Sequence, residues 1–221
     1  MGIMAWAMSF AVYAKANTLR VFGEPRKGSF PISEAYLVYA PEDGKTVEKV
    51  TGLLSEDIFR VTGKKVGMRT EVAGGHPVIL GIHGKGNGLI SRMVEEGRLD
   101  VSSLEGGCEQ FIIRRVENPL PGVKDALVIV GSDRRGVAYG AFTLSEAMGV
   151  SPFYWWADVP VERRARLWVK ADYVSDKPSV CYRGIFLNDE GWGLNPWAAK
   201  TFEKELGNIG PKTYARVCEL V

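Results

Sequence analysis

The chain has 221 residues, of which 46% are hydrophobic and 24% charged, so it has the composition of a globular protein and enough length for one domain or one and a part. Its 28 Lys and Arg against 26 Asp and Glu leave a formal net charge of +2, which gives no broad electrostatic reason to expect a nucleic acid or an anionic membrane as partner. The three cysteines and two histidines follow no disulfide or metal-binding spacing, so we expect no metal or other cofactor.

The first sixteen residues, MGIMAWAMSFAVYAKA, are mostly apolar and end in Ala14-Lys15-Ala16, which fits the small-x-small pattern of a signal cleavage site. We therefore expect residues 1–16 to be a cleaved export signal and the protein to be periplasmic or secreted, although the positively charged start of such a signal is missing. The alternatives are a start assigned too early and an N-terminal segment that packs against the domain. The stretch is too short to predict a membrane span, and no other run in the chain has the length and apolarity to cross a bilayer.

From residue 35 onward, strand and helix patterns alternate, which predicts a small α+β layer, an α/β sandwich. Apolar residues recur at helical spacing from Val47 to Val61, and Gly63 can cap the end of this helix. A shorter helix is expected at 89–96. Strands are expected at 35–39, 78–82, 111–113 and 126–130, with turns at 41–44 and 118–122.

A third helix is expected to begin after the loop 131–136, where Ser132 or Asp133 can cap the exposed backbone amides, and to end at Gly149. Small residues on one face of this helix allow it to approach the sheet closely. Arg135, beside the helix N-terminus, is a candidate for binding a carboxylate or phosphate group of a ligand. The alternative is that it is solvated or bridges to another domain.

An aromatic linker, 151–161, follows the third helix, and a domain boundary is expected within 160–180. The rings of Tyr154, Trp155 and Trp156 could stack on sugars, because flat apolar rings with a polar edge suit carbohydrates. Packing between domains is the alternative use of such rings.

The segment 183–193, Arg-Gly-Ile-Phe-Leu-Asn-Asp-Glu-Gly-Trp-Gly, is a short apolar run that stops at polar groups. It predicts a buried strand that delivers Asn188, Asp189 and Glu190 to its carboxyl end, as strands of a (β/α) barrel do. A glycosidase needs two carboxyls about 5–9.5 Å apart across the sugar, and neighbours on one strand rarely supply both. A second carboxylate is therefore expected from another strand, unless Asp189 and Glu190 only solvate a loop. The helix expected at 213–220 completes one barrel unit.

Three segments, Gly131–Gly140, Gly149–Pro160 and Arg183–Glu190, closely resemble glycoside hydrolase family 115, the xylan α-1,2-glucuronidases. The match in residue type and order runs from about residue 35 to the last residue. The resemblance implies an N-terminal domain similar to the second domain of β-hexosaminidases, followed by a (β/α)8 catalytic barrel. It also implies inverting removal of glucuronic acid or its 4-O-methyl ether from xylan side chains, with glucuronoxylan as the substrate. For the full-length protein, a homodimer is the candidate assembly.

By this resemblance Asp189 is the candidate for water activation or substrate binding, and Glu190 is the second catalytic candidate. The substrate-binding candidates are Asn188, Trp192, Arg135 and Trp156. The chain departs from the family pattern by ending inside the first barrel helix. The general acid is therefore expected beyond Val221, and this polypeptide alone is expected to be inactive.

The expected organisation is thus an export signal at 1–16, an α/β domain with its aromatic linker at 17–175, and the first strand and helix of a truncated barrel at 176–221. A different reading is a non-catalytic carbohydrate-binding or scaffolding module. A hexosaminidase-like enzyme that shares only the N-terminal domain is a third, and fold alone does not exclude it.

Overall fold

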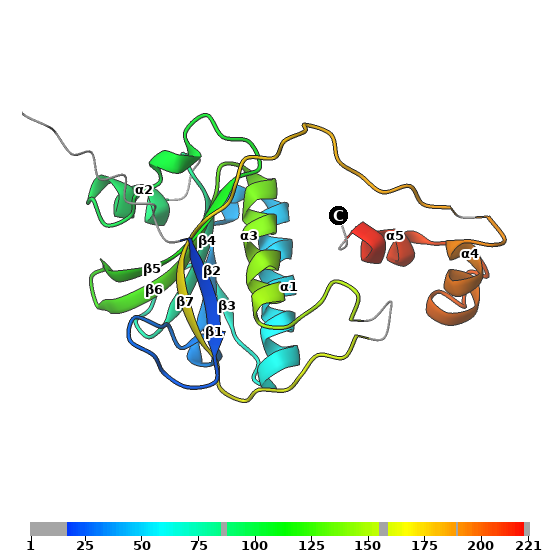
Figure 1. The fold of residues 1–221 in the computed structure, drawn as a ribbon, viewed down its shortest axis with the longest axis horizontal. Coiled ribbons are helices and arrows are strands. Elements are labelled where there is room, and N and C mark those ends of the chain that lie inside the picture. Colours follow the sequence, from blue (N-terminus) through cyan, green and yellow to red (C-terminus); the bar gives the residue numbers. More distant parts are fainter. Residues whose placement is uncertain (1–16, 85–87, 155–158, 189, 219–221) are drawn as a thin grey trace, which may run out of the picture.

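A seven-stranded mixed β-sheet lies at the centre of the described chain (Figure 1). The computed structural model describes residues 17–84, 88–154, 159–188 and 190–218, so the expected export signal, Trp155, Trp156 and Asp189 lie outside the described residues. The strands are β1 (Thr18–Phe22), β2 (Tyr36–Tyr39), β3 (Met68–Arg69), β4 (Pro77–Ile82), β5 (Phe111–Leu120), β6 (Val123–Gly131) and β7 (Trp168–Val174). Their order across the sheet is β1-β7-β5-β6-β4-β2-β3. Strands β3, β2, β4 and β6 pair in parallel, whereas β5 and β1 pair antiparallel to their neighbours.

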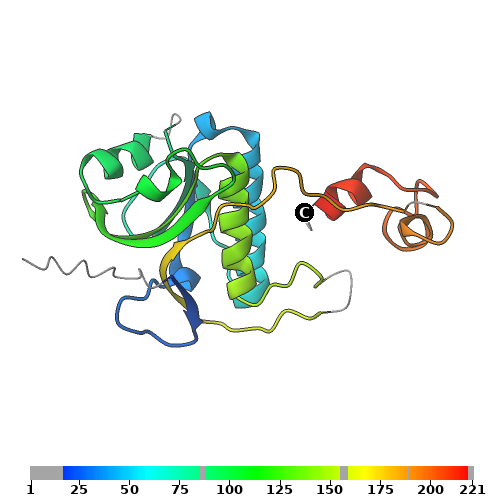
Figure 2. The ribbon, with the colours of Figure 1, turned by 45° about the horizontal axis from the view of Figure 1, so that its top comes forward.

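Helices cover the two faces of this sheet unequally. Helices α1 (Lys45–Thr62) and α3 (Arg134–Ala147) lie side by side on one face, and α2 (Gly88–Glu95) lies on the other (Figures 1 and 2). Because both faces are covered at β4, all six of its residues are buried, as its unbroken apolar run predicts. Two shorter helices, α4 (Leu194–Trp197) and α5 (Pro211–Val217), lie beyond α1 and α3 on the side away from the sheet, with a π-helical turn at Ala198–Phe202. No helix within the described residues is long and apolar enough to span a membrane.

The predicted helix ends are confirmed by their capping geometry. Gly63 caps α1 in the left-handed conformation, with φ 74°. The Asp133 carboxylate caps α3 by accepting hydrogen bonds from the backbone N–H groups of Arg135 and Gly136, both at 2.9 Å. Of the two cap candidates in the sequence, the structure therefore selects Asp133.

The small residues of α3 allow the close approach to the sheet that the sequence predicts. A Cβ at Gly136 would lie 2.2 Å from the backbone oxygen of Gln110, and a Cβ at Gly140 would lie 2.6 Å from a methyl group of Ile129. Backbone atoms cannot move aside as a flexible side chain can, so Gly136 is the less replaceable of the two.

We expect Gly136→Ala to lower the free energy of unfolding by about 2–3 kcal/mol, because the added methyl group forces α3 away from Gln110. Thermal or urea unfolding measures this loss. The matched control is Gly52→Ala in α1, where the new Cβ would meet only the Met68 sulfur at 3.8 Å. There we expect a gain of about 0.5–1 kcal/mol, since alanine is the better helix former. Equal effects of the two changes would contradict the packing argument.

The sheet is wider than the four strands expected from the sequence. Strand β7 lies inside the segment expected to be a domain boundary, and β1 lies where no element was expected. Only Val169 and Ala171 of β7 are buried. Strand β5 also runs to Leu120, through a bulge at which Asn118 has φ 49°, so the expected turn at 118–122 shrinks to the residues beyond Leu120.

The prediction of a buried strand at 183–188 is wrong for this structure. The segment has no strand pairing in the described part of the chain, and Ile185 and Phe186 are 52% and 92% exposed. An extended segment becomes a strand only when a neighbouring strand accepts and donates its backbone hydrogen bonds. The described residues offer no such neighbour to 183–188.

Candidate functional site

The first part of the candidate site lies at the carboxyl edge of the parallel strands, where α/β sheets commonly bind ligands. A hollow there is bounded by the ends of β4 and β6 and by the N-terminus of α3. Its lining residues are Glu42, Asp43, Ile82, Ser132, Asp133, Arg134 and Arg135. Two of the carboxylates that line the hollow accept hydrogen bonds from backbone N–H groups. Asp133 caps α3, and Asp43 accepts the N–H of Ile82 at 3.2 Å.

Glu109 stands at the border of this hollow and holds two arginines. Its side chain is 6% exposed, and one carboxylate oxygen accepts a hydrogen bond from Arg135 at 2.5 Å while the other accepts one from Arg183. Arg183 also donates to the Tyr139 hydroxyl at 3.2 Å and lies over that ring, 5.6 Å from its centroid. The four residues Glu109, Arg135, Arg183 and Tyr139 are called the Glu109 cluster below.

Hydrogen bonds from Arg135 and then Arg183 lower the pKa of Glu109, although partial burial acts to raise it. The same carboxylate raises the pKa of Arg135 and that of Arg183. All three groups therefore stay charged at neutral pH, and the cluster joins the α/β body to the start of the segment 183–193. Arg135 is largely exposed and pairs with Glu109 of the same α/β body, so no bridge from Arg135 itself to another domain is seen among the described residues, and its role in substrate binding stays a prediction.

The second part of the site is a tight turn, called the turn 188–194 below, of which the structure describes Asn188 and residues 190–194. The Asn188 side-chain oxygen accepts the N–H of Glu190 at 3.0 Å, and the Asn188 backbone oxygen accepts the N–H of Leu194 at 2.8 Å. A Cβ at Gly193 would lie 1.9 Å from that backbone oxygen, so the turn requires glycine there. Glu190 is exposed and Trp192 is 97% exposed, so the turn presents a carboxylate and an indole ring to solvent.

The structure does not bring all the predicted site residues together. Asn188, Glu190 and Trp192 belong to the turn, whereas Arg135 belongs to the Glu109 cluster, which contacts the chain at Arg183. Asp189 and Trp156 lie outside the described residues. Sequence reasoning missed Glu109, since no spacing along the chain connects residue 109 with residue 183.

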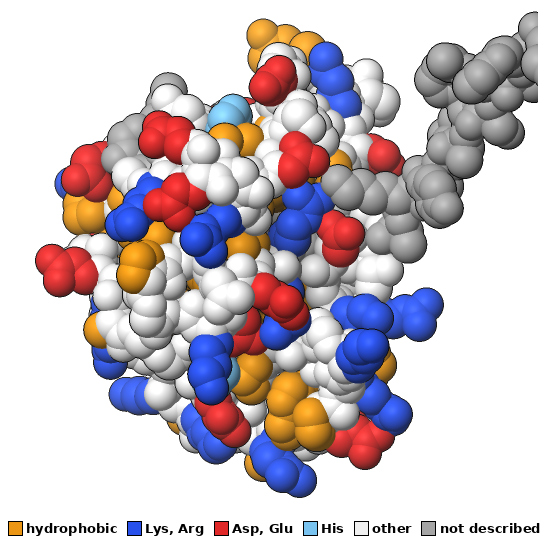
Figure 3. Space-filling model, turned by 90° about the vertical axis from the view of Figure 1, so that its left-hand side faces the viewer, with side chains coloured by type: hydrophobic (Ala, Val, Ile, Leu, Met, Phe, Trp, Pro, Cys, Tyr) orange, Lys and Arg blue, Asp and Glu red, His pale blue; other side chains and the backbone are white. Residues whose placement is uncertain are grey.

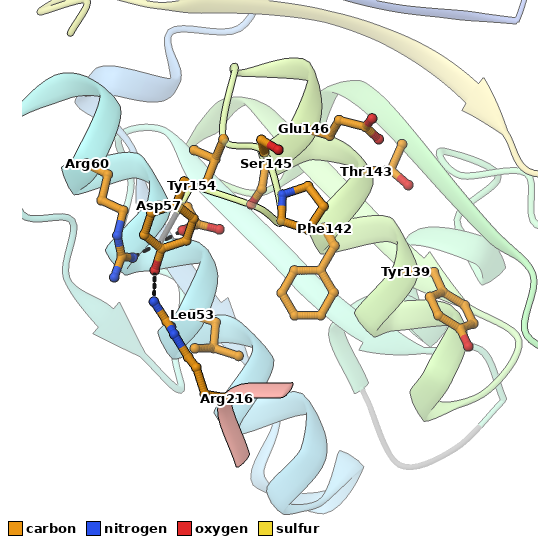
Figure 4. A pocket seen from close by; sticks show the side chains of 13 residues that line it. Leu53, Asp57, Arg60, Tyr139, Phe142, Thr143, Ser145, Glu146, Tyr154 and Arg216 are labelled. Carbon is orange, nitrogen blue, oxygen red and sulfur yellow. Dashed lines mark hydrogen bonds and ion pairs between the residues drawn. The ribbon is translucent and has the colours of Figure 1, made fainter. Parts of the chain in front are cut away.

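A cavity of about 220 Å³ lies between α1, α3 and α5 (Figure 4). Tyr154 from the aromatic linker lies between two cations, with Arg60 and Arg216 at 4.7 and 5.1 Å from its ring centroid, and Arg216 also donates to its hydroxyl. Burial raises the pKa of Asp57 on the same wall, against the opposing effects of Ser145 and Arg60. Tyr154 thus packs the linker against α1 and α5, which favours the packing role over sugar stacking for this residue.

Glu203 organises the end of the described chain. Its side chain is buried and accepts hydrogen bonds from the backbone N–H groups of Gly210, Lys212 and Thr213 and from the Thr213 hydroxyl, at 2.5–3.2 Å. Burial is the largest influence and acts to raise the pKa, but these hydrogen bonds outweigh it and hold the pKa of Glu203 below its ordinary value. Glu203 is therefore the cap that fixes the start of α5.

We expect Glu203→Ala to speed amide hydrogen exchange in 210–217 by about tenfold or more, because four donors lose their acceptor, while exchange in the sheet stays unchanged. Since the pKa of Glu203 is lowered on folding, this stabilisation is present above pH 4.5 and is lost as the pH falls below that value. The control is Glu205→Ala, which removes only an exposed ion pair to Lys212. An equal effect of the two changes would contradict the capping role.

Comparison with known proteins finds relatives of this chain. The family model described as Glycosyl hydrolase family 115 matches residues 175–221, which include the turn and Glu203. The solved structure of a family GH115 4-O-methyl-α-glucuronidase, BtGH115A, matches 86% of the chain with 34% identity and a TM-score of 0.70. The chain belongs to glycosyl hydrolase family 115. The predicted resemblance is thereby confirmed.

This family member spans 24% of the length of BtGH115A, whose published description adds a specificity for decorated arabinogalactans. A second solved structure, CpGH84D, is 12% identical, with a TM-score of 0.40 over 71% of this chain and 21% of its own, and it carries no argument. No curated protein matches the chain.

Proposed function

We propose that the chain is the N-terminal part of an exported glycoside hydrolase that removes α-1,2-linked glucuronic acid, or its 4-O-methyl ether, from xylan. The observation that carries the proposal is the family match over 175–221, because that segment contains the polar turn 188–194. The 34% identity to a 4-O-methyl-α-glucuronidase supports the uronic acid as the sugar released.

In this proposal Asp189 activates the attacking water or binds the sugar, and Glu190 is the second catalytic candidate. Trp192 stacks on a sugar face, a role for which its full exposure leaves the ring accessible. Asn188 and Trp156 bind the substrate, and Arg135 contributes from the Glu109 cluster. Inversion requires a general acid about 6.5–9.5 Å from the base, which we place in the part of the full-length protein that follows Val221.

The domain assignment is part of the same proposal. The α/β body corresponds to the second domain of β-hexosaminidases, and 176–221 begins a (β/α)8 barrel. Segment 183–188 would then become a strand when the rest of the barrel supplies its neighbours, which agrees with its extended, unpaired state. The full-length enzyme is proposed to be secreted or periplasmic and to form a homodimer.

A second candidate substrate is arabinogalactan that carries glucuronic acid, since the similar solved enzyme is described as specific for decorated arabinogalactans. The two polysaccharides share the uronic acid side group and differ in the sugars of the polysaccharide backbone.

The test is to incubate the full-length protein with glucuronoxylan and with decorated arabinogalactan and to follow the reaction by proton NMR. The expected result is release of 4-O-methylglucuronic acid or glucuronic acid, first seen as the β-anomer. An α-anomer would refute inversion. Release from neither polymer, with binding retained, would favour the non-catalytic carbohydrate-binding module.

A further inference from the structure

Within the described residues, no helix covers one face of the edge strand β1 and its neighbour β7. Leu19, Val21, Val169 and Ala171 point into the core beneath α1 and α3, so the alternate side chains of both strands face the opposite way. On that opposite face, the core that α2 covers is built from β2, β4, β5 and β6 and takes only Val174 from β1 and β7. The rest of the β1–β7 face is therefore open, on the side of the sheet away from α4 and α5 (Figures 1 and 2).

Positive charge gathers on this open face. Arg20 and Lys170 are direct cross-strand partners, an arrangement of like charges that costs stability in a sheet. With Arg26 and Lys27 they line a shallow hollow of about 520 Å³. Among the described residues, no acidic side chain forms an ion pair with Arg20, Lys27 or Lys170, and Arg26 pairs with Glu24.

Aromatic rings border the same charges. Phe22 lines the hollow and is the cross-strand partner of Trp168. Arg26 lies over the Phe22 ring at 6.0 Å, and Arg166 lies over the Trp168 ring at 5.7 Å. Figure 3 views the molecule from this side and shows Lys and Arg side chains gathered at its lower right, with hydrophobic side chains beside them.

We propose that the β1–β7 face is a second carbohydrate-binding surface, separate from the turn 188–194, which holds an acidic polysaccharide by its glucuronate carboxylates. Arginine and lysine supply charge-assisted hydrogen bonds to carboxylates, while aromatic rings stack on the apolar faces of sugars. The uncompensated pair of Arg20 and Lys170 is stabilised when a carboxylate lies between them. The identity of the ligand rests on the proposed function, because a glucuronic-acid-bearing polymer is the polyanion such an enzyme meets.

Binding without turnover tests this surface directly. The chain is titrated by isothermal calorimetry with 4-O-methylglucuronoxylan and with the same polymer after reduction of its carboxyl groups. We expect the double variant Arg20→Gln/Lys170→Gln to bind glucuronoxylan about tenfold more weakly, and the reduced polymer to bind wild type about as weakly as that. The midpoint temperature of thermal unfolding should be no lower for the variant than for wild type, since a repulsive pair is removed.

The matched control is Lys45→Gln/Lys49→Gln, which removes the same charge from exposed positions on α1, across the sheet. An equal loss of binding in this control would overturn the proposal, as would unchanged binding by Arg20→Gln/Lys170→Gln. Equal affinity for dextran sulfate, a polyanionic polysaccharide without uronate groups, would show general attraction to polyanions and would overturn the assignment to a uronate-bearing polysaccharide.

A failure of this surface can be distinguished from a failure of the proposed hydrolase. The full-length protein is assayed on a short glucuronoxylo-oligosaccharide and on the polymer. We expect Arg20→Gln/Lys170→Gln to leave turnover of the oligosaccharide unchanged and to raise KM for the polymer several-fold. If the full-length protein hydrolyses neither the oligosaccharide nor the polymer, the proposed glucuronidase activity is refuted. The calorimetric titration still shows whether the β1–β7 face binds the polysaccharide.

Discussion

Asp189→Asn in the full-length protein is expected to lower kcat for glucuronate release by roughly 10²–10⁴-fold, because the amide cannot accept a proton from the attacking water. KM for a glucuronoxylo-oligosaccharide should change little if the residue acts in the chemical step, and should rise if it binds the sugar. Steady-state kinetics on a defined oligosaccharide measure both constants. The midpoint temperature of thermal unfolding of the Asp189→Asn variant should differ from that of wild type by no more than is usual for a substitution on a protein surface.

Asp176→Asn is the control, since it makes the same chemical change at an exposed position thirteen residues earlier. Glu190→Gln completes the set. A variant Asp189→Asn with near-normal turnover, beside an inactive Glu190→Gln, would transfer the catalytic role to Glu190. Normal turnover in both variants would remove the turn 188–194 from the catalytic assignment.

Glu109→Gln is expected to release the segment 176–194 from the α/β body, because the neutral amide cannot hold two guanidinium groups by charge. Limited proteolysis within this segment should become about tenfold faster or more, with amide hydrogen exchange in α1 and α3 unchanged. In the full-length enzyme we expect a lower kcat, since Arg183 begins the segment that carries Asp189. Glu109 is a positioning residue in this account and does not touch the substrate.

Two controls make the Glu109 prediction specific. Glu105→Gln makes the same change at an exposed site on the preceding loop and should have no effect. Glu109→Gln/Arg183→Gln should be no worse than Glu109→Gln, because the two residues act through one interaction. Additive losses in the double variant would contradict the coupling.

The pH dependence of this attachment follows from the lowered pKa of Glu109. A carboxyl group whose pKa is lowered on folding contributes stability that is fully present above its ordinary value of 4.5 and is lost as the pH falls below it. The attachment of 176–194 to the α/β body, followed by the resistance of this segment to proteolysis, should therefore be constant from neutral pH down to about pH 5 and should decline only in more acidic solution. A decline beginning near neutrality would contradict the cluster.

The identity of the family could be read from the sequence because it is carried by contiguous motifs. The segment Arg183–Glu190 and the helix start at Asp133 are recognisable without knowledge of their neighbours. The core elements α1, α3, β4 and β6 were equally predictable, since their apolar spacing repeats over enough residues to determine which face is buried.

The sequence by itself thus determined the family and the α/β layer of strands and helices, and it supplied the polar groups that are expected to do chemistry. Only the tertiary structure decided that β1 pairs with β7 across about 150 residues, that Glu109 holds Arg183, and that 183–188 lacks a strand partner. The physical reason is the range of the forces involved. Helix caps and apolar periodicity are set by residues a few positions apart, whereas strand pairing and the Glu109 cluster depend on groups that only folding brings together.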